Sequence, residues 1–572
     1  MRPVRIANFS GFLGDRATAL AEMAETAEAD VLTGDYLAEV TMRVLAKGRA
    51  RDPEGGYAEA FVHHLRPAMG TIAASGIRVV VNAGGLNPHG LATRLRKVAA
   101  EAGVQLNIAT VAGDDISTHW SDLLGDLDFE PATANAYLGG WGIAEALRRG
   151  AQVVVTGRVA DASLAAGAAA WWHNWSRDNW NALAGAVVAG HVIECGTQAT
   201  GGNTKLDPAP DGRLLGFPIA EIAADGTSLI TKPAGTGGTV DHDAVTAQLV
   251  YEIQGRYYAN PDVTTDLTTI ALTRQGPDSI RVSGAAGHAP PPDTKVALTA
   301  DGDWVNTMYL AVTGTGFEAK RVQLDTALRA FLTPVTGIDE LGVELIGTEA
   351  DDPATQNQAT GLLRVTARGS DEAAVGRVFS NGVVQLGLAN YPGLYLTAPP
   401  GKATRAGRYH AAFVAQNRLD HVATLEGGET IAITPPPVTA PYVEAFDAAP
   451  PPASTGGAGD TVTCRLGDIA LGRSGDKGAN ANVGIWVDTG ARWDWLHGWL
   501  TTDRFRGLLP EAAGCEVRRL SLPNLRALNF VVTGLMPGGA AGARRFDTQA
   551  KGLSEFLRAR VIEVPRDLLD ND

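Results

Sequence analysis

The stretch IRVVVNAGGLNPHGLATRLRKVAAEAG, residues 77–103, decides the fold class of this chain. An apolar run rich in β-branched residues leads into a Gly and Asn turn, and a helical pattern follows. The run has no in-and-out alternation, which is typical of a strand buried on both faces of a parallel sheet. Similar runs occupy residues 4–8, 29–33, 104–112 and 151–157. We therefore predict that the chain begins with an α/β domain on a mostly parallel sheet.

Polar loops follow these five predicted strands. Ligands of open parallel sheets bind at the carboxyl ends of the strands, so the loops are expected to converge on one rim. The candidate binding residues in the loops are Gly11, Asp15, Arg16, Asp35, Asn82, Gly84, Gly85 and Asn87. The fifth loop adds Arg158 and Asp161, which we expect to orient a substrate. Each turn alone also fits ordinary loop chemistry, and only their recurrence favours a site.

The segment GHVIECGTQATGGN, residues 190–203, crowds an imidazole, a carboxylate and a thiol into five positions. His191 or Glu194 is the predicted general acid or base, and Cys195 is a candidate nucleophile. Glycine-rich backbone that can approach a ligand follows, at Gly201, Gly202 and Asn203. The alternative is a helix that ends in Cys-Gly and carries a His and Glu pair on its surface.

A second glycine-rich turn runs from residue 232 to 243, KPAGTGGTVDHD, before a helical pattern. Unpaired N–H groups at a helix N-terminus bind anions such as phosphate or carboxylate. The candidate anion-binding residues are Lys232, Gly235, Thr236, Gly237 and Gly238. The equal alternative is a flexible turn with an Asp that caps the helix.

The rest of the sequence predicts an α+β portion of the large domain, a linker and a small C-terminal domain. Residues 260–430 alternate as in an antiparallel α+β portion of the large domain, residues 1–434, with a possible break near 255. A Pro and Gly-rich linker spans 435–460. Residues 461–572 read as a small α+β domain of ferredoxin-like order, which ends in a helix at 548–564.

The C-terminal domain carries a polar stretch, RSGDKGANAN at residues 473–482, which we interpret as a glycine-punctuated loop. It either binds a ligand across a domain interface or is a solvated loop with a local Asp and Lys pair. Its candidate binding residues are Ser474, Asp476, Lys477 and Asn480.

Composition limits the classes of partner. The formal net charge of -15 over 572 residues argues against nucleic acid and anionic membranes as partners, since both are polyanions. Three widely spaced cysteines and the lack of a signal-like or membrane-spanning apolar run favour a cytoplasmic protein. We expect a small-molecule substrate and a homodimer or higher homo-oligomer.

Several long motifs resemble the acyclic terpene utilisation AtuA-like family, whose small C-terminal domain is ferredoxin-like. They are GFLGDR (11–16), NAGGLNP (82–88), TGRVADA (156–162), the segment 175–203 that ends in GHVIECGTQATGGN, KPAGTGGTV (232–240), RSGDKGANAN (473–482) and LPNLRALNFVVTGL (522–535). The first departs at Leu13 from the GFSGDR form expected. The resemblance implies a place in catabolism of acyclic monoterpenes beside enzymes of branched acyl-CoA thioesters.

The available chemistry is proton transfer, because the sequence has no dinucleotide fingerprint, phosphate loop, HExxH or GxSxG motif. We expect a hydratase, dehydratase or C–C lyase that acts beside the carbonyl of a branched or carboxylated acyl-CoA and requires no cofactor. A divalent metal held by His191, Glu194 and another carboxylate stays open. The alternatives are a hydro-lyase of a free acid and a non-catalytic scaffold subunit of an acyl-CoA complex.

Overall fold

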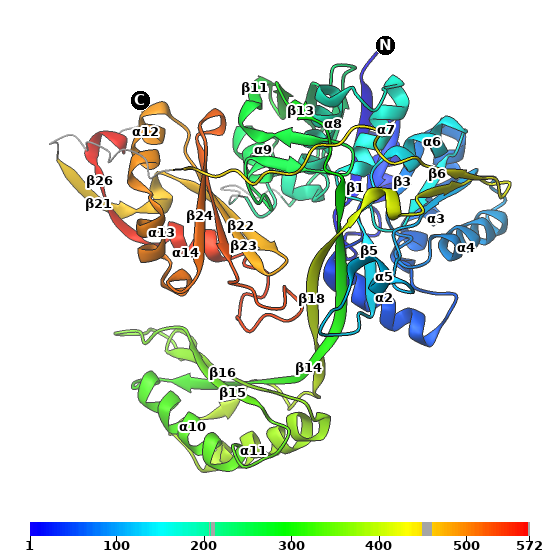
Figure 1. Cartoon of the computed structure of the whole chain (residues 1–572). Coiled ribbons are helices and arrows are strands. Elements are labelled where there is room, and N and C mark those ends of the chain that lie inside the picture. The colour runs from blue at the N-terminus through cyan, green and yellow to red at the C-terminus, as the bar shows by residue number, and fades with distance from the viewer. Residues whose placement is uncertain (205, 207–211, 449–459, 570–572) are drawn as a thin grey trace. The chain divides into compact units, whose positions relative to one another are not determined.

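The computed structural model describes residues 1–204, 206, 212–448 and 460–569 (Figure 1). The chain divides into two compact units, of which the first combines residues 1–300 with 409–572. The second unit is residues 301–408, whereas the sequence prediction put a subdomain break near residue 255. Within the described residues, no helix combines the length and the hydropathy needed to span a membrane.

The α/β class is confirmed, but the large sheet is mixed rather than mostly parallel. Its parallel centre contains, in spatial order, β1 (Val4–Ser10), β2 (Val31–Gly34), β3 (Arg78–Val81), β6 (Val153–Thr156) and β4 (Ile108–Ala112). Antiparallel strands extend both sides of this centre. They are β7 (Ile219–Ile222), β8 (Ser228–Thr231), β12 (Ser279–Ser283) and β11 (Ala271–Gly276) beside β1, and β19 (Val422–Thr424) and β20 (Thr430–Ala432) beside β4.

The central strands are buried on both faces, as their lack of alternation predicted. On β3, Val79 and Val81 belong to one apolar core and Val80 belongs to another. The first core is covered by α1 (Ala19–Thr26), α3 (Glu59–Ser75) and α4 (Pro88–Glu101). The second core includes α6 (Trp141–Arg148), α7 (Ser163–His173) and α8 (Trp180–Ile193). Both faces of the sheet therefore bury apolar surface against helices.

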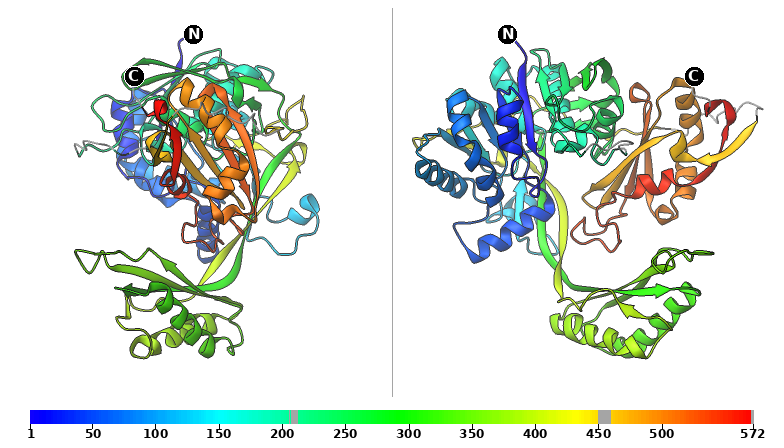
Figure 2. Two further views of the ribbon diagram at one scale, coloured as in Figure 1. Left: turned by 90° about the vertical axis from the view of Figure 1, so that its left-hand side faces the viewer. Right: turned by 180° about the vertical axis from the view of Figure 1, so that it is seen from behind.

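Further strands lie outside the large sheet. Strands β9 (Tyr257–Ala259), β10 (Thr264–Asp266) and β13 (Ala286–His288) form a small antiparallel sheet. The 21-residue strand β14 (Asp293–Thr313) pairs with β5 (Thr133–Ala136) and with β18 (Thr404–Ala415). In Figures 1 and 2, β14 and β18 are the long green and yellow-green pair. Their outer halves enter the second unit.

The second unit has a core of its own. Strands β15 (Glu340–Ile346) and β16 (Thr360–Gly369), the end of β14, and β17 (Tyr395–Leu396) form its antiparallel sheet. Helices α10 (Phe317–Leu332) and α11 (Phe379–Val384) contribute buried Leu and Phe side chains to the core against this sheet.

The C-terminal domain has an antiparallel sheet in the order β22 (Leu471–Lys477), β23 (Asn480–Trp486), β25 (Ala527–Thr533) and β24 (Glu516–Leu522). Its helices are α12 (Gly490–Trp499), α13 (Thr502–Leu508) and α14 (Leu553–Arg558). Strands β21 (Thr461–Arg465) and β26 (Val561–Pro565) form a separate pair.

Two sequence predictions about this domain are wrong. The expected helix 548–564 is only the short α14, because Val561–Pro565 pairs with β21 instead. Residues 473–482 are not a loop but the hairpin of β22 and β23, which turns at Gly478 with φ +61°. Of the predicted linker, residues 449–459 lie outside the described part, and Asp447 accepts a 2.9 Å hydrogen bond from the Ser521 backbone N–H.

Candidate active site

A cavity of about 840 Å³ lies within the first unit, between the large domain and the C-terminal domain. Segments far apart in the sequence form its wall: the loop after β6, strand β9, the start of β14, the end of β18 and the turn between β22 and β23. Its charged and aromatic lining includes Tyr137, Asp161, Glu252, Tyr257, Tyr258, Lys295, Tyr409 and Lys477. Its volume is in the upper part of the range of about 300–1,000 Å³ for small-molecule sites.

The carboxyl ends of the parallel strands meet, as the strand-end argument predicted. Asn82 after β3 donates a 2.6 Å hydrogen bond to buried Asp35 after β2. Asp114 after β4 accepts 2.8 Å bonds from the Arg158 backbone N–H after β6 and from the Asn135 amide. Burial, with Asp161 nearby, raises the pKa of Asp35 well above its ordinary value. Burial raises the pKa of Asp114 to about 7.

Arg158 connects this rim to the cavity. Its buried guanidinium lies 2.8 Å from Asp161 and donates to the Leu37 carbonyl at 3.0 Å and to the Tyr137 hydroxyl at 2.9 Å. Asp161 faces the cavity, whereas Arg158 is absent from the described lining. Arg158 is therefore placed to position Asp161 and Tyr137 from behind.

The C-terminal domain completes the cavity through Lys477. Its ammonium lies 2.9 Å from Glu252, and both side chains are about a quarter exposed, at 26% and 24%. Burial raises the pKa of Glu252, but Lys477 and Lys551 outweigh it and hold this pKa at about 2. The backbone N–H of Glu252 also donates to Asn482 at 2.8 Å, so the two domains share a polar contact.

The predicted acid and base pair lies behind the cavity wall. The Nδ1 atom of His191 lies 3.1 Å from Glu194 Oε1, and both residues are buried. Burial lowers the pKa of His191, but the Glu194 carboxylate outweighs this and the net pKa is raised. Burial raises the pKa of Glu194 to about 7. The His191 ring packs 4.9 Å, centroid to centroid, from Tyr258, which lines the cavity.

Cys195 has a different environment from that of a nucleophile. Burial, followed by the charges of Glu194 and Glu252, raises the pKa of its thiol well above the ordinary value. A reactive cysteine needs a lowered pKa and access to solvent. Its backbone is instead a packing surface for Gly11, where an added Cβ would lie 2.5 Å from the Cys195 carbonyl carbon.

The polar side chains of the loop after β1 bond to neighbouring residues. The Asp15 carboxylate accepts from the Gly11 N–H at 2.6 Å, and burial raises the pKa of Asp15. Arg16 pairs with Glu22 at 2.6 Å. These contacts stabilise the turn and leave no described contact with the cavity.

The glycines and the asparagine of the loop after β3 also have local structural roles. A Cβ on Gly84 would lie 2.5 Å from the Thr156 carbonyl oxygen, and Gly85 has φ +52°. Asn87 caps α4 by accepting from the Gly90 N–H at 2.8 Å. Both glycines serve close backbone packing, and Asn87 serves as the cap.

The glycine-rich turns likewise serve local structure. Gly201 (φ +108°) ends a short 3-10 helix, Gly196–Thr200, and a Cβ on Gly202 would lie 2.9 Å from the Thr197 oxygen. The backbone carbonyl of Asn203 accepts a 2.8 Å bond from Arg473 of the C-terminal domain.

The second glycine-rich turn does not present a free anion cradle. Lys232 pairs with Asp278 at 3.1 Å and donates to the Thr236 carbonyl at 2.9 Å. The Gly237 N–H donates to the Leu214 carbonyl at 2.9 Å. Gly235 and Gly238 have φ of +78° and +81°, as the tight turn requires. Asp241 caps α9 (His242–Leu249), so the helix-cap alternative describes this turn.

The hairpin of β22 and β23 has mixed roles. Ser474 accepts from the Ser554 backbone N–H at 3.0 Å inside the C-terminal domain. Burial, with Glu252 nearby, raises the pKa of Asp476 to about 7. Asn480 lines the cavity and donates to Gln254 at 3.1 Å. Lys477 and Asn480 are therefore the two predicted hairpin residues that reach the cavity.

Most of the lining was missed by the sequence analysis, including these five residues: Tyr137, Glu252, Tyr258, Lys295 and Tyr409. They come from five separate segments, and none belongs to a recognisable motif. The adjacent tyrosines at 257 and 258, between Gly255 and Pro261, were the one local signal that could have drawn attention to this wall.

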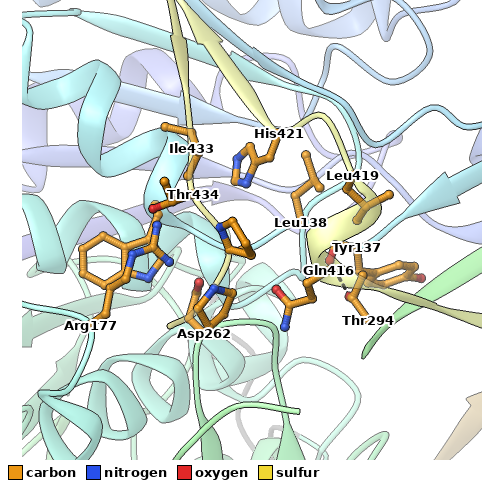
Figure 3. Close-up of a pocket in the computed structure, with 14 residues that line it drawn as sticks. Tyr137, Leu138, Arg177, Asp262, Thr294, Gln416, Leu419, His421, Ile433 and Thr434 are labelled. Atoms are coloured by element: carbon orange, nitrogen blue, oxygen red, sulfur yellow. Dashed lines mark hydrogen bonds between the residues drawn. The ribbon is translucent and has the colours of Figure 1, made fainter. Parts of the chain in front are cut away.

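A much smaller hollow of about 20 Å³ adjoins the same wall, since Tyr137 and Thr294 line both (Figure 3). It has space for one water molecule. Asp262 accepts from the Gly140 N–H at 2.6 Å there, and burial lowers the pKa of His421 to about 3. In the described part of the chain, no group of three or more His, Cys, Asp and Glu side chains is placed to hold a metal ion.

Residues 4–425 match the family described as acyclic terpene utilisation family protein AtuA. The chain belongs to this AtuA family. Residues 464–563 match the AtuA ferredoxin-like domain, which agrees with the fold of the C-terminal part. No curated protein matches the chain. Both matched AtuA segments contribute residues to the 840 Å³ cavity.

Proposed function

We propose that this AtuA-family chain is an enzyme of acid and base chemistry that acts on a branched or carboxylated acyl-CoA thioester. The reaction adds or removes water, or cleaves a C–C bond, next to the thioester carbonyl. One observation supports it most: a carboxylate, a phenol and an ammonium, from Asp161, Tyr258 and Lys477, face one cavity of substrate size. No nucleotide or metal is needed for such a step.

Asp161 is the proposed base. It faces the cavity and its carboxylate is fixed 2.8 Å from the buried Arg158 guanidinium. In the dehydration of a hydroxyacyl thioester, Asp161 takes the proton from the carbon beside the carbonyl. The electron pair forms the C=C bond as the C–O bond to the hydroxyl breaks.

Tyr258 is the proposed acid. Burial, followed by the Glu194 charge, raises its pKa well above the usual range, so the phenol keeps its proton. It gives this proton to the departing hydroxyl, which leaves as water. The His191 and Glu194 pair behind its ring has a carboxyl pKa of about 7 and can hold a proton close to Tyr258. The proposed role of this pair is thus to position Tyr258 rather than to touch the substrate.

Lys477 is the proposed stabiliser of developing negative charge on the thioester oxygen. Its ammonium is fixed by Glu252 at 2.9 Å, and a preorganised cation in a partly desolvated site stabilises an oxyanion more than in water. The family description names acyclic terpenes, whose branched chains suit a cavity wall with five tyrosines, including Tyr442.

The test is to incubate the full-length protein with branched enoyl-, hydroxyacyl- and carboxyacyl-CoA thioesters and follow mass changes. Parallel reactions contain the corresponding free acids. We expect gain or loss of water, or a split acyl chain, that falls at least a hundredfold in Asp161→Asn and Tyr258→Phe. Asp503→Asn and Tyr395→Phe, both outside the described cavity lining, serve as matched controls.

The outcomes separate the alternatives. Turnover of free acids without turnover of thioesters would identify a hydro-lyase of a free acid. Absence of turnover together with absence of thermal stabilisation by any CoA compound would refute the proposal. Equal loss of activity in the control variants would remove Asp161 and Tyr258 from the mechanism.

A further inference from the structure

Lys295, at the start of β14, is held in the cavity mainly by aromatic faces. Its Nζ atom lies 4.8 Å from the Tyr137 ring centroid and 5.5 Å from the Tyr409 ring centroid. The carboxylate nearest to it among the recorded ion pairs is Glu39, at 3.8 Å. By comparison, Lys477, the other lysine in the described cavity lining, has a carboxylate partner at 2.9 Å. Of these two lysines, Lys295 therefore has the weaker contact with an anion of the described protein.

Tyr409 lies beside this ammonium. The residue is 92% buried, with a relative exposure of 8%. Its hydroxyl oxygen faces the Lys295 ammonium, which can only donate, and among the described residues no acceptor receives the O–H. Native proteins rarely leave a buried hydroxyl unpaired, and such a group calls for a specific explanation. A bound ligand that accepts the bond is one such explanation.

The C-terminal domain fixes the Tyr409 ring in place. A Cβ added at Gly478 would lie 2.9 Å from its Cε1 atom, and one at Gly539 would lie 3.0 Å from its Cβ atom. Only the close approach that glycine permits allows both turns to contact this side chain. The hydroxyl and the Lys295 ammonium are thus two preorganised donors on one wall.

We infer that Lys295 and Tyr409 form a subsite for a carboxylate group of the ligand. The inference rests on the proposed function, because it assigns the acidic substrate to the same cavity. One ammonium and one hydroxyl match the charge and the two acceptor oxygens of a carboxylate. Asp161 and Glu252 line the same cavity, and these carboxylates oppose the entry of a doubly charged phosphate. Lys295 is then the specificity residue that selects carboxylated over neutral acyl chains.

The test is isothermal titration calorimetry on the full-length protein with glutaryl-CoA, pentanoyl-CoA and free glutarate. The two thioesters have the same chain length and differ in a terminal carboxylate. We expect glutaryl-CoA to bind about tenfold to a hundredfold more tightly, as for a hydrogen bond to a charged group. Lys295→Met is expected to abolish this preference and leave pentanoyl-CoA binding unchanged.

Tyr409→Phe removes only the hydroxyl and is expected to weaken glutaryl-CoA binding about threefold to tenfold. This conservative variant keeps the test decisive if Lys295→Met fails to fold. Lys97→Met, on the exposed side of α4, is the matched control and should bind like the natural chain.

The remaining outcomes are also informative. Equal affinity for both thioesters, or a Lys295→Met variant that weakens both alike, would overturn the subsite. Lys295-dependent binding of free glutarate alone would support the subsite while contradicting the thioester part of the proposed function. Binding of none of the three probes, or tighter binding of inorganic phosphate than of glutarate, would overturn the carboxylate assignment.

Discussion

The replacement Lys477→Met should show how much the ion pair between Lys477 and Glu252, which joins the two domains around the cavity, contributes to the free energy of unfolding. It removes the ammonium 2.9 Å from Glu252 and leaves a partly buried carboxylate without this partner. Glu252 has an ordinary pKa of 4.5, which the charged neighbours lower to about 2. A tenfold change in proton affinity corresponds to about 1.4 kcal/mol, so the whole shift stabilises the folded state by about 3 kcal/mol at pH 7.

Lys477 accounts for only part of this value, because Lys551 also lowers the pKa of Glu252. We therefore expect Lys477→Met to lower the free energy of unfolding by about 2 kcal/mol at pH 7. The sign of the pH dependence is fixed by the depressed pKa. The stabilisation is present above about pH 4.5 and is lost as the pH falls towards 2. The cost of the substitution should accordingly shrink between pH 7 and pH 3.5.

The assay is urea denaturation at pH 7 and pH 3.5, followed by tryptophan fluorescence, for four proteins. They are the natural chain, Lys477→Met, Glu252→Gln and the double variant. Hydrogen exchange of the Glu252 N–H, which bonds Asn482 across the interface, reports local opening in the same samples. Because the double variant leaves no lone charge, it should be more stable than the sum of the two single losses predicts.

A coupling energy below about 0.5 kcal/mol at pH 7 would refute the reasoning, since that is the level at which independent sites add. A cost of Lys477→Met that stays constant between the two pH values would also refute it. Lys97→Met controls for the general effect of removing one exposed positive charge.

Three further predictions concern the rim of the cavity. Gly11→Ala should destabilise the chain by about 1–3 kcal/mol in urea denaturation, because its Cβ would lie 2.5 Å from the Cys195 backbone. The control is Gly48→Ala, at a helical position with open space around it, which should stabilise the chain by about 0.5–1 kcal/mol. Burial raises the pKa of Asp114 from 3.8 to about 7, so unfolding free energy should fall as the pH rises through this window, and less so in Asp114→Asn. Iodoacetamide at pH 8 should label Cys195 much more slowly in the native protein than in urea, and equal rates would contradict its raised pKa.

The parallel centre of the sheet could be predicted because its cause is local. Strands such as β3 carry an unbroken apolar run, and the side chains that follow must lie at one sheet edge. The contact of Asp35 with Asn82 across two strand ends follows from that rule alone. The antiparallel strands β11 and β12 were predicted only as part of an α+β portion of the large domain, because nothing in their alternation tells which sheet they extend.

The hairpin of β22 and β23 was misread for a physical reason. Gly, Asn, Asp and Ser favour turns by propensity, so residues 473–482 look like a loop. In the structure the same small residues allow close packing. A Cβ at Gly475 would lie 2.3 Å from the Tyr251 ring, and one at Gly484, two residues beyond this stretch on β23, would lie 2.4 Å from Val250. Packing against another domain decides this local structure, and single-sequence patterns do not contain that information.

Both domains contribute side chains to the cavity, so in the proposed reaction the ferredoxin-like domain supplies part of the active site. The large domain supplies Asp161 and Tyr258, but Lys477 comes from the other side, and the turns at Gly478 and Gly539 seat Tyr409. A chain that ends at residue 448 would retain the proposed acid and base. It would lack the proposed oxyanion cation and a fixed carboxylate subsite. A ligand that contacts both walls must therefore stabilise the domain interface, in proportion to its occupancy.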